Sequence, residues 1–381
     1  MTTTSERVSE TLMREASQRV SQSVFDGSRL RVVLLVDVYD GAQQQFLEAY
    51  EQLCNQVASV PGHVSDQLCQ SIENPSQWLI TSEWESAPPF LTWVNSEDHV
   101  RMVEPLHSCV RDTRSLRFHV VRETGGPAAA ESGARGLQAS PRIGDGLVRH
   151  ALTFTVKPGS EDAVAEILAG YASPESRVDD TTQLCRTSLF MHGNRVVRAI
   201  EVRGDLLAAL RHVAKQPEVR AVEEAINPYL EQDRDLDDPE AARLFFTRAA
   251  LPAVHHVTSG QDSADAERQA LYYPAREGCG MRLAELLARQ DAVASDDPRT
   301  PLLRSTIFQR DDVVVRLVDV RGGFDNVAML GLSEPELAAE LAELLDAEAL
   351  EAGSAGPDGV GAHRLTVPRM DLVTDRRASD A

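Results

Sequence analysis

The feature of the sequence that most constrains the fold is an internal repeat. The segment LCRTSLFMHGNRVVRAIEVRG (184–204) aligns without a gap with LLRSTIFQRDDVVVRLVDVRG (302–322), because both ends are displaced by 118 residues. Further along, LPAVHHVT (251–258) aligns with VPRMDLVT (367–374). This spacing is longer than the roughly 20–50 residues of solenoid repeats. It therefore indicates a duplicated domain.

Each copy shows one order of predicted elements. In the first copy, residues 148–159 alternate apolar and polar side chains as a strand does, and residues 160–172 begin with a Ser cap and continue as an amphipathic helix. The aligned segments then form a hairpin, and a second helix and a last strand follow. This β-α-β-β-α-β order is that of a ferredoxin-like unit.

The N-terminal third fits the same plan. RLRVVLLVDVYDG (29–41) is predicted to be its first strand, and SLRFHVVRE (115–123) its last. A helix, a hairpin and the helix FLTWVNSEDHVRMV (90–103) are predicted between them. We therefore expect an α+β fold class, in which three ferredoxin-like units form dimeric α+β barrels.

These elements predict five regions along the chain. They are an N-terminal helix (1–27), a ferredoxin-like domain (28–123), a linker rich in Gly, Ala, Ser and Pro (124–145), a first repeat (146–260) and a second repeat (261–376). The helix is predicted because apolar residues recur at four-residue steps.

A ferredoxin-like sheet carries helices on one face and needs a second layer on the other. The two repeats can cover each other within one chain. The N-terminal unit then remains, which predicts a symmetric homodimer through that unit. Pairing of the N-terminal unit with the first repeat is the alternative arrangement.

Charge and cysteine usage exclude several classes of partner. The formal net charge of -21 repels nucleic-acid phosphates and anionic lipid, so we expect neither nucleic acid nor membrane as a partner. The five cysteines are scattered and odd in number, and the N-terminus lacks the apolar segment of a signal peptide. We therefore expect a cytoplasmic protein.

One segment of the N-terminal third, SEWESAPPFLTWVNSEDHV (82–100), holds two of the three tryptophans of the chain. Its W-E-S tripeptide beginning at Trp84, followed by Phe90, Trp93 and Asn95, resembles the antibiotic biosynthesis monooxygenase family. That family consists of small α+β barrel dimers, and some members oxidise aromatic polyketides without a cofactor. The duplicated remainder resembles the SchA/CurD-like domain, which accompanies bacterial aromatic polyketide and spore-pigment pathways.

The resemblance implies a site in the N-terminal domain. Trp93, Asn95 and His99 are the expected catalytic residues: Trp93 walls a cleft and offers its indole N–H, Asn95 donates its amide to an oxyanion, and His99 is the base, since histidine titrates near neutral pH. The expected substrate-binding residues are Trp84, Phe90 and His107, of which His107 is also the reserve base.

The reaction expected at such a site needs no redox group from the protein. An electron-rich phenol or anthrone that loses a proton becomes a carbanion, which can reduce O2 itself. We therefore expect a cofactor-independent monooxygenase of type II polyketide biosynthesis, which converts an aromatic polyketide to a quinone or a hydroxylated ring. Molecular oxygen is the co-substrate, and no cofactor or metal is expected.

Two other functions stay open. The first is a non-catalytic protein that binds a polyketide, or the polyketide cyclases or ketoreductase of its pathway. The second is a haem-binding or haem-degrading relative. Haem-degrading members carry a His ligand ten residues after the tryptophan that Trp93 resembles, where this chain has Val103. Pro105 is expected to interrupt the helix between His99 and His107.

Purely structural roles also stay open for the same residues. Trp93 can be a core residue, Asn95 and Ser96 can terminate or cap a helix, and His99 can be a surface residue. In the repeats, charged residues recur that predict cross-strand ion pairs within each hairpin, with an anion or phenolate site inside the barrel as the alternative. The recurring pairs are Arg186 and Arg304, Arg198 and Arg316, and Glu201 and Asp319. His255 and His256 are adjacent on a strand and therefore point to opposite faces, so they cannot share a metal ion.

Overall fold

The structure, a computed structural model, divides into two compact units. One comprises Ser23–Arg142, and the other comprises Met1–Gln22 together with Ile143–Ala381. Each unit is described by itself. Residues 1–19 of the predicted N-terminal helix and most of the predicted linker lie outside the described part of the chain. The described residues are 20–122, 144–232, 234–261, 265–322, 335–353 and 369–378.

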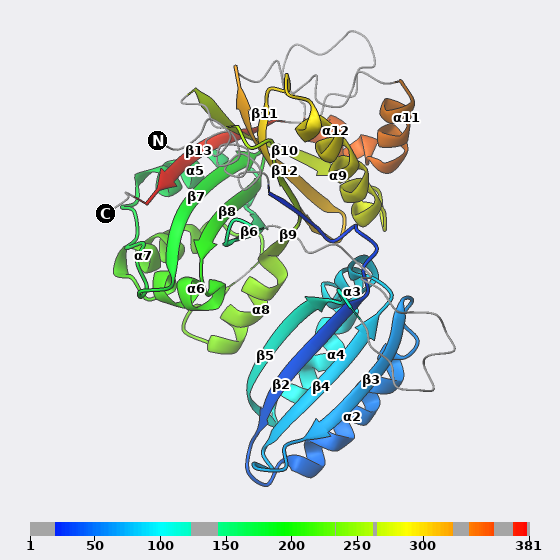
Figure 1. The fold of residues 1–381 in the computed structure, drawn as a ribbon. Coiled ribbons are helices and arrows are strands. Elements are labelled where there is room, and N and C mark those ends of the chain that lie inside the picture. Colours follow the sequence, from blue (N-terminus) through cyan, green and yellow to red (C-terminus); the bar gives the residue numbers. More distant parts are fainter. Residues whose placement is uncertain are drawn as a thin grey trace, which may run out of the picture. The chain divides into compact units, whose positions relative to one another are not determined.

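The N-terminal unit is a four-stranded antiparallel sheet with helices on one face (Figure 1). Its elements are β2 (Leu30–Val38), α2 (Gln43–Val57), β3 (His63–Gln70), β4 (Gln77–Trp84), α3 (Ala87–Val94), α4 (Glu97–His107) and β5 (Val110–His119). The strand order is β3-β4-β2-β5, so the first strand lies between the third and the fourth. This arrangement, with helices after the first and the third strand, is ferredoxin-like.

Strand alternation builds the core of this unit. On β2, Val36 and Val38 are buried on the helix side, where they pack with Phe46 of α2 and Trp78 of β4. Burying a side chain of this size contributes about 1.5–3 kcal/mol. The period-two pattern of the sequence therefore selects which face of the sheet receives the helices.

The helix predicted over residues 90–103 is two helices, α3 and α4. Asn95 ends α3, and the Ser96 hydroxyl accepts a hydrogen bond of 3.2 Å from the backbone N–H of His99 at the start of α4. The capping alternative for these two residues is therefore correct. The expected interruption at Pro105 is wrong, because α4 continues to His107 with the proline in its last turn.

The C-terminal unit is a closed, eight-stranded antiparallel barrel, so the fold class is α+β. The first repeat supplies β6 (Leu147–Thr155), β7 (Gln183–His192), β8 (Arg195–Arg203) and β9 (Ala250–Thr258), and the second supplies β10 (Ala266–Pro274), β11 (Leu302–Arg310), β12 (Val313–Arg321) and β13 (Arg369–Arg377). The order is β9-β11-β12-β10-β13-β7-β8-β6, and β6 pairs with β9 to close the ring. The two repeats thus cover each other within one chain.

The last strand of each repeat joins the two sheets. β9 pairs with β6 of its own repeat at one end, and with β11 of the other repeat from Arg304 to Phe308. β13 does the same with β10 and with β7. A closed barrel leaves neither repeat with an unpaired edge, which removes the tendency of exposed edges to aggregate.

Helices cover the outside of this barrel (Figure 1). They are α5 (Glu161–Gly170), α6 (Leu206–Ala214), α7 (Pro217–Ile226) and α8 (Pro239–Ala249) in the first repeat, and α9 (Gly280–Asp296), α11 (Pro335–Leu344) and α12 (Ala347–Gly353) in the second. The equivalent helices α5 and α9 differ in length, with 10 and 17 residues.

The predicted N-terminal helix is wrong for its last residues. Ser21–Ser23 form the strand β1, which lies beside β9 in the barrel sheet. The backbone N–H of Thr258 donates to the carbonyl of Val20 at 3.0 Å. Strand pairing with residues more than 200 positions away in the chain therefore outweighs the local four-residue helical pattern here.

The barrel interior combines an apolar cluster with buried polar and charged side chains. Phe190, Val197, Phe308 and Val315 share one buried cluster inside the barrel.

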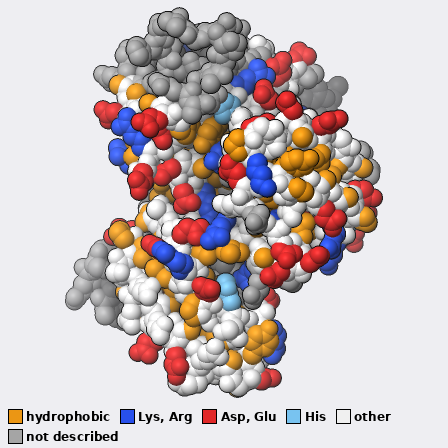
Figure 2. All heavy atoms as spheres, turned by 180° about the vertical axis from the view of Figure 1, so that it is seen from behind, with side chains coloured by type: hydrophobic (Ala, Val, Ile, Leu, Met, Phe, Trp, Pro, Cys, Tyr) orange, Lys and Arg blue, Asp and Glu red, His pale blue; other side chains and the backbone are white. Residues whose placement is uncertain are grey.

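Acidic side chains are spread over the face shown in Figure 2 rather than gathered in one patch. Among the described residues, no helix is both long enough and apolar enough to cross a membrane.

Candidate functional site

The aromatic residues predicted from the sequence form one cluster in the N-terminal unit. Trp84 and Trp93 stack with their ring centroids 5.4 Å apart and their planes at 27°. The Phe90 ring lies 5.3 Å from Trp84 and 6.2 Å from Trp93. Trp84 and Phe90 are buried, whereas Trp93 is half-buried. The structure therefore brings together three of the predicted site residues.

The local sequence explains this cluster. β4 ends at Trp84, and the prolines that follow Ala87 favour the immediate start of α3, since proline fits the first turn of a helix. The short turn folds α3 back against the end of the strand. Phe90 and Trp93, three residues apart on one side of α3, then meet Trp84.

The two indole N–H groups differ. Trp84 Nε1 donates to the Ser82 hydroxyl at 3.0 Å. Trp93 Nε1 is buried and has no hydrogen-bond partner among the described residues. Leaving a buried donor unpaired costs about 1–3 kcal/mol. Trp93 therefore offers a donor to which a ligand oxygen could bind.

The predicted base contacts Trp93. The His99 ring stands edge-on to the Trp93 ring at 4.5 Å and 76°. The Ser96 cap fixes the first turn of α4, from which His99 projects. Asn95 lies in the turn between the two helices. His99 and Trp93 are therefore placed to contact one guest molecule.

His107 is not part of this cluster. It is exposed at the end of α4, eight residues after His99, which corresponds to about 12 Å along a helix. The structure thus separates His107 from the other predicted residues. His107 is therefore not placed to act as an alternative base beside Trp93.

Two residues beside the cluster were not predicted. The His63 ring lies 5.2 Å from Trp84, and His63 Nε2 lies 2.9 Å from a carboxylate oxygen of Asp66. Residues three apart on a regular strand face opposite sides, but a bulge between His63 and Ser65 shifts the register of β3 and turns both to one face. The Arg117 guanidinium lies over the Phe90 ring at 5.3 Å. The sequence carries no local signal for the bulge.

The described residues hold no group of three or more His, Cys, Asp or Glu side chains placed to bind a metal ion. Two hollows stand out among them, and neither is lined by Trp93, Asn95 or His99. One is an open groove between α2 and α4, lined by Gln52 and Arg101 among others. The other lies in the first repeat. The rings of Trp84, Phe90 and Trp93 instead pack against one another.

Some of the charged residues that recur in the repeats pair outside their own hairpin, whereas the charge of Arg304 lowers the pKa of Asp319 within the second hairpin. Arg186 Nη1 lies 3.3 Å from Asp319, and Arg268 Nη2 lies 2.7 Å from Glu201, so these pairs join the two repeats inside the barrel. Arg268 Nε also lies 2.7 Å from Asp319. Side chains that point into a barrel meet those of the opposite sheet, which local spacing does not reveal.

This barrel cluster is internally neutralised. Burial raises the pKa of the Asp319 carboxyl, but its hydrogen bonds with Arg268 and the charges of Arg268 and Arg186 outweigh burial, so the pKa lies below its usual range. Asp375 behaves in the same way beside Arg186, which it contacts at 2.6 Å. The arginines are thus matched by ionised carboxylates, which favours ion pairing over an anion site.

The second recurring pair also departs from the prediction. Arg198 Nη1 lies 2.7 Å from Glu223 of α7, and Arg316 contacts Asp291 of α9. Both arginines therefore pair with a helix, on the outer face of the strands.

The adjacent histidines point to opposite faces, as predicted. His256 Nδ1 lies 2.9 Å from the Thr306 hydroxyl inside the barrel, whereas His255 lies near Asp291 and Arg316 on the helix side. Burial lowers the pKa of both imidazoles.

Comparison with known proteins identifies both parts of this chain. The model of the family described as "Antibiotic biosynthesis monooxygenase" matches residues 29–105, and that of the "SchA/CurD like domain" matches residues 147–259. The fold and these matches define a class of protein in which a monooxygenase-like α+β domain precedes a SchA/CurD-like barrel.

Relatives of known name match nearly the whole chain. "Polyketide synthase CurD" of Streptomyces cyaneus is 62% identical over 95% of this chain and 99% of its own length. "Protein SchA" of Streptomyces halstedii is 60% identical over 94% of this chain and 96% of its own length. The "42.8 kDa protein in whiE locus" of Streptomyces coelicolor is 59% identical over 94% of this chain and 91% of its own. The chain belongs to the SchA/CurD family, and one of these relatives is named a polyketide synthase.

Among solved structures, a mutant of SnoaB from Streptomyces nogalater, described as a cofactor-independent oxygenase, is 16% identical. The match covers 26% of this chain and 96% of SnoaB, with a TM-score of 0.24.

Proposed function

We propose that the N-terminal domain is a cofactor-independent monooxygenase that oxidises a polycyclic aromatic polyketide. The observation that carries the proposal is the buried, unpaired indole N–H of Trp93 with the His99 imidazole 4.5 Å from its ring. The match of residues 29–105 to the monooxygenase family and the name of the relative "Polyketide synthase CurD" support it.

His99 starts the reaction by removing a proton from the activated CH2 of an anthrone. The Trp93 N–H donates to the ring oxygen, on which negative charge develops. The carbanion passes one electron to O2, and the two radicals combine to a peroxide at the same carbon. Loss of water from this peroxide leaves a carbonyl. In balance, CH2 and O2 become C=O and H2O, and the substrate supplies all the electrons.

The aromatic cluster determines how a substrate enters the site. Trp84 and Phe90 are buried and form a fixed wall, whereas Trp93 and His99 are half-buried. A flat ring enters when the Trp93 side chain shifts from its stack with Trp84. The hydrogen bond that Trp93 Nε1 then gains compensates part of the lost stacking.

The test measures O2 consumption by the purified full-length protein with an anthrone and no added metal, flavin or NADPH. We expect a rate above that of the anthrone alone. Trp93→Phe and His99→Ala should each lower it by tenfold or more, because a positioned base typically contributes about 10²–10⁴-fold. Asn95→Ala should also lower it. His107→Ala is the matched control, since His107 lies on the same helix outside the cluster. Full rates for all three cluster variants would show that the site is elsewhere.

A non-catalytic role in binding a polyketide is the second candidate. The hollow of the first repeat, which none of the residues of the aromatic cluster lines, favours it. Polyketide cyclases or a ketoreductase with basic patches would suit the acidic surface as partners. Tight binding of an anthrone without O2 consumption would support this role. A Soret shift on hemin titration would instead favour the haem-binding alternative, against which the valine at position 103 argues.

A further inference from the structure

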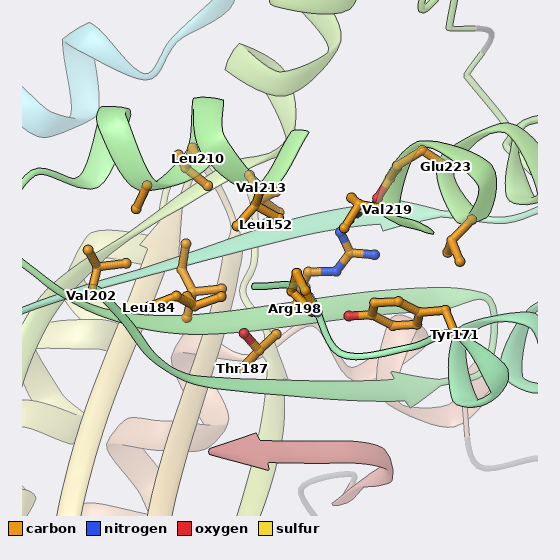
Figure 3. A pocket seen from close by; sticks show the side chains of 14 residues that line it. Leu152, Tyr171, Leu184, Thr187, Arg198, Val202, Leu210, Val213, Val219 and Glu223 are labelled. Atoms are coloured by element: carbon orange, nitrogen blue, oxygen red, sulfur yellow. Dashed lines mark hydrogen bonds and ion pairs between the residues drawn. The ribbon is translucent and has the colours of Figure 1, made fainter. Parts of the chain in front are cut away.

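The first repeat contains an apolar hollow between its sheet and its helices. The strands β7 and β8 form the floor, and α6 and α7 form the opposite wall (Figure 3). About 60 Å³ of it is open to a water-sized sphere. Its apolar lining includes Leu184, Ile200, Val213 and Val219.

A difference between the repeats explains why the hollow exists. The glycines with positive φ that precede the equivalent helices, Gly159 and Gly278, are 119 residues apart, so Asp291 of α9 corresponds to Ala172. In the first repeat α5 has already ended at Gly170, and Pro174 prevents its continuation. The helix turns that cover the sheet in the second repeat are therefore missing in the first.

The equivalent arginines show the consequence. Arg316 of the second repeat is buried beneath α9, where Asp291 neutralises it. Arg198 of the first repeat lines the hollow instead, and Glu223 of α7 neutralises it at 2.7 Å. Burial raises the pKa of Glu223, but the charges of Arg198 and Arg234 outweigh burial and hold that carboxyl below its usual pKa. Glu223 is thus shared between two arginines, of which only Arg198 lines the hollow.

One polar group of a residue that lines the hollow has no hydrogen-bond partner among the described residues. Arg198 Nε is buried without a hydrogen-bond partner, because only Nη1 reaches Glu223 among the described contacts. Arg316 Nε is also unpaired, but α9 covers it. Tyr171 follows the end of α5, and its hydroxyl points into the hollow toward Arg198 (Figure 3). An apolar wall with one fixed N–H donor is suited to a ligand that is flat, apolar and oxygen-bearing.

We propose that this hollow binds the terminal ring of an aromatic molecule that carries a phenolic or carbonyl oxygen, with Arg198 Nε donating to that oxygen. The open space is smaller than the ~150 Å³ of a cavity that holds benzene. The half-buried side chains of Tyr171 and Pro174 at the rim therefore move aside, and the rest of a larger molecule lies in the mouth.

The test uses the full-length protein with 2-naphthol and naphthalene as probes, whose own fluorescence reports binding. The wild type should bind 2-naphthol more tightly than naphthalene. Arg198→Lys keeps a charge for Glu223 but loses the Nε donor, so it should weaken 2-naphthol binding by about 3–10-fold, the size of one hydrogen bond, and leave naphthalene unchanged. Arg316→Lys, at the covered equivalent position, should change neither affinity.

Filling the hollow gives a second comparison. Ala209→Leu adds bulk at a buried lining position and should weaken both probes by at least tenfold. Val213→Phe, at a half-buried lining position, serves the same purpose if Ala209→Leu does not fold. In the Trp93→Phe background, Arg198→Lys and Ala209→Leu should weaken probe binding by the same factors as in the wild type, which separates this site from the aromatic cluster of the N-terminal unit.

A crystal structure with 2-naphthol then locates the ring. Density over Arg198 would support the proposal, and density elsewhere would overturn it. Equal affinity for the two probes, or filled variants that bind as the wild type does, would also overturn it. Loss of this binding with unchanged O2 consumption would leave the proposed oxygenase intact, so the two proposals fail separately.

Discussion

Trp84 and Trp93 stack on each other, yet they differ in burial and in one hydrogen bond. Trp84 is fully buried with its N–H paired to Ser82, which is the pattern of a structural residue. Trp93 is half-buried with its N–H unpaired. The sequence could predict that both tryptophans lie together, because the strand, the turn and the helix between them are local. It could not predict which indole lacks a partner, because that depends on the Ser82 rotamer.

A stability comparison at the residue scale separates the two roles. Trp84→Ala should lower the free energy of unfolding of the N-terminal unit by about 3–5 kcal/mol, because it leaves a cavity. Trp93→Phe should cost far less, since it removes an unpaired donor. Urea unfolding followed by tryptophan fluorescence measures both, because all three tryptophans lie in this unit. Equal losses would contradict the assignment of Trp93 as the functional indole.

At the scale of elements, the turn between α3 and α4 and the length of α5 determine the two sites. The pattern of apolar residues predicted one helix through Asn95 and Ser96, whereas the Ser96 cap starts a new one. The sequence predicted the first helix of this repeat to continue to residue 172, whereas α5 ends at Gly170, and the effect of this early end appears only beside the longer α9. The sequence correctly placed His255, His256 and the recurring arginines on strands. Several of their partners come from the opposite repeat or from helices, which strand register and bulges determine. The bulge at His63 has the same effect in the N-terminal unit.

The capping prediction is testable with a matched pair. Ser96→Ala should lower the stability of the N-terminal unit by about 0.5–2 kcal/mol, because it removes the hydrogen bond to the first turn of α4. It should also lower the oxidation rate, since His99 then loses its fixed position. Ser86→Ala is the control, because Ser86 precedes α3 without a side-chain capping bond. Urea unfolding should show a clearly smaller effect for Ser86→Ala, and equal effects would contradict the role of the cap.

At the scale of the whole molecule, duplication explains the barrel, whereas the N-terminal unit holds a single sheet with exposed apolar side chains on one face. Leu35 and Phe118 are 42% and 51% exposed on the face away from the helices. The repeats close on each other because each has an equivalent sheet within the chain. The N-terminal unit has no such equivalent, so we propose that a second copy covers it.

Light scattering with size-exclusion chromatography tests this homodimer. Phe118→Glu should give a monomer, because it places a charge in the apolar contact. Leu47→Glu, at an exposed position on α2 of the same unit, should leave the dimer unchanged. A monomeric wild type would rule the dimer out.

The buried histidines of the barrel predict how stability depends on pH. Burial lowers the pKa of His192, His255 and His256 in the folded protein. Below about pH 6.5 the unfolded chain therefore binds protons that the folded chain does not, and stability falls as the pH decreases. Calorimetry should show a declining Tm between pH 7.5 and 5, with a smaller decline for His256→Asn. The same decline in both proteins would contradict a role for His256.

Isotope labelling of the product is the most direct measurement of the proposed oxidation. Full-length protein, freed of metal with a chelator, is incubated with an anthrone under ¹⁸O2, and the quinone is analysed by mass spectrometry. We expect one ¹⁸O atom in each quinone, formed faster than without protein and at the uncatalysed rate with the Trp93→Phe/His99→Ala double variant. Quinone oxygen derived from water, or a double variant as fast as the wild type, would contradict the account.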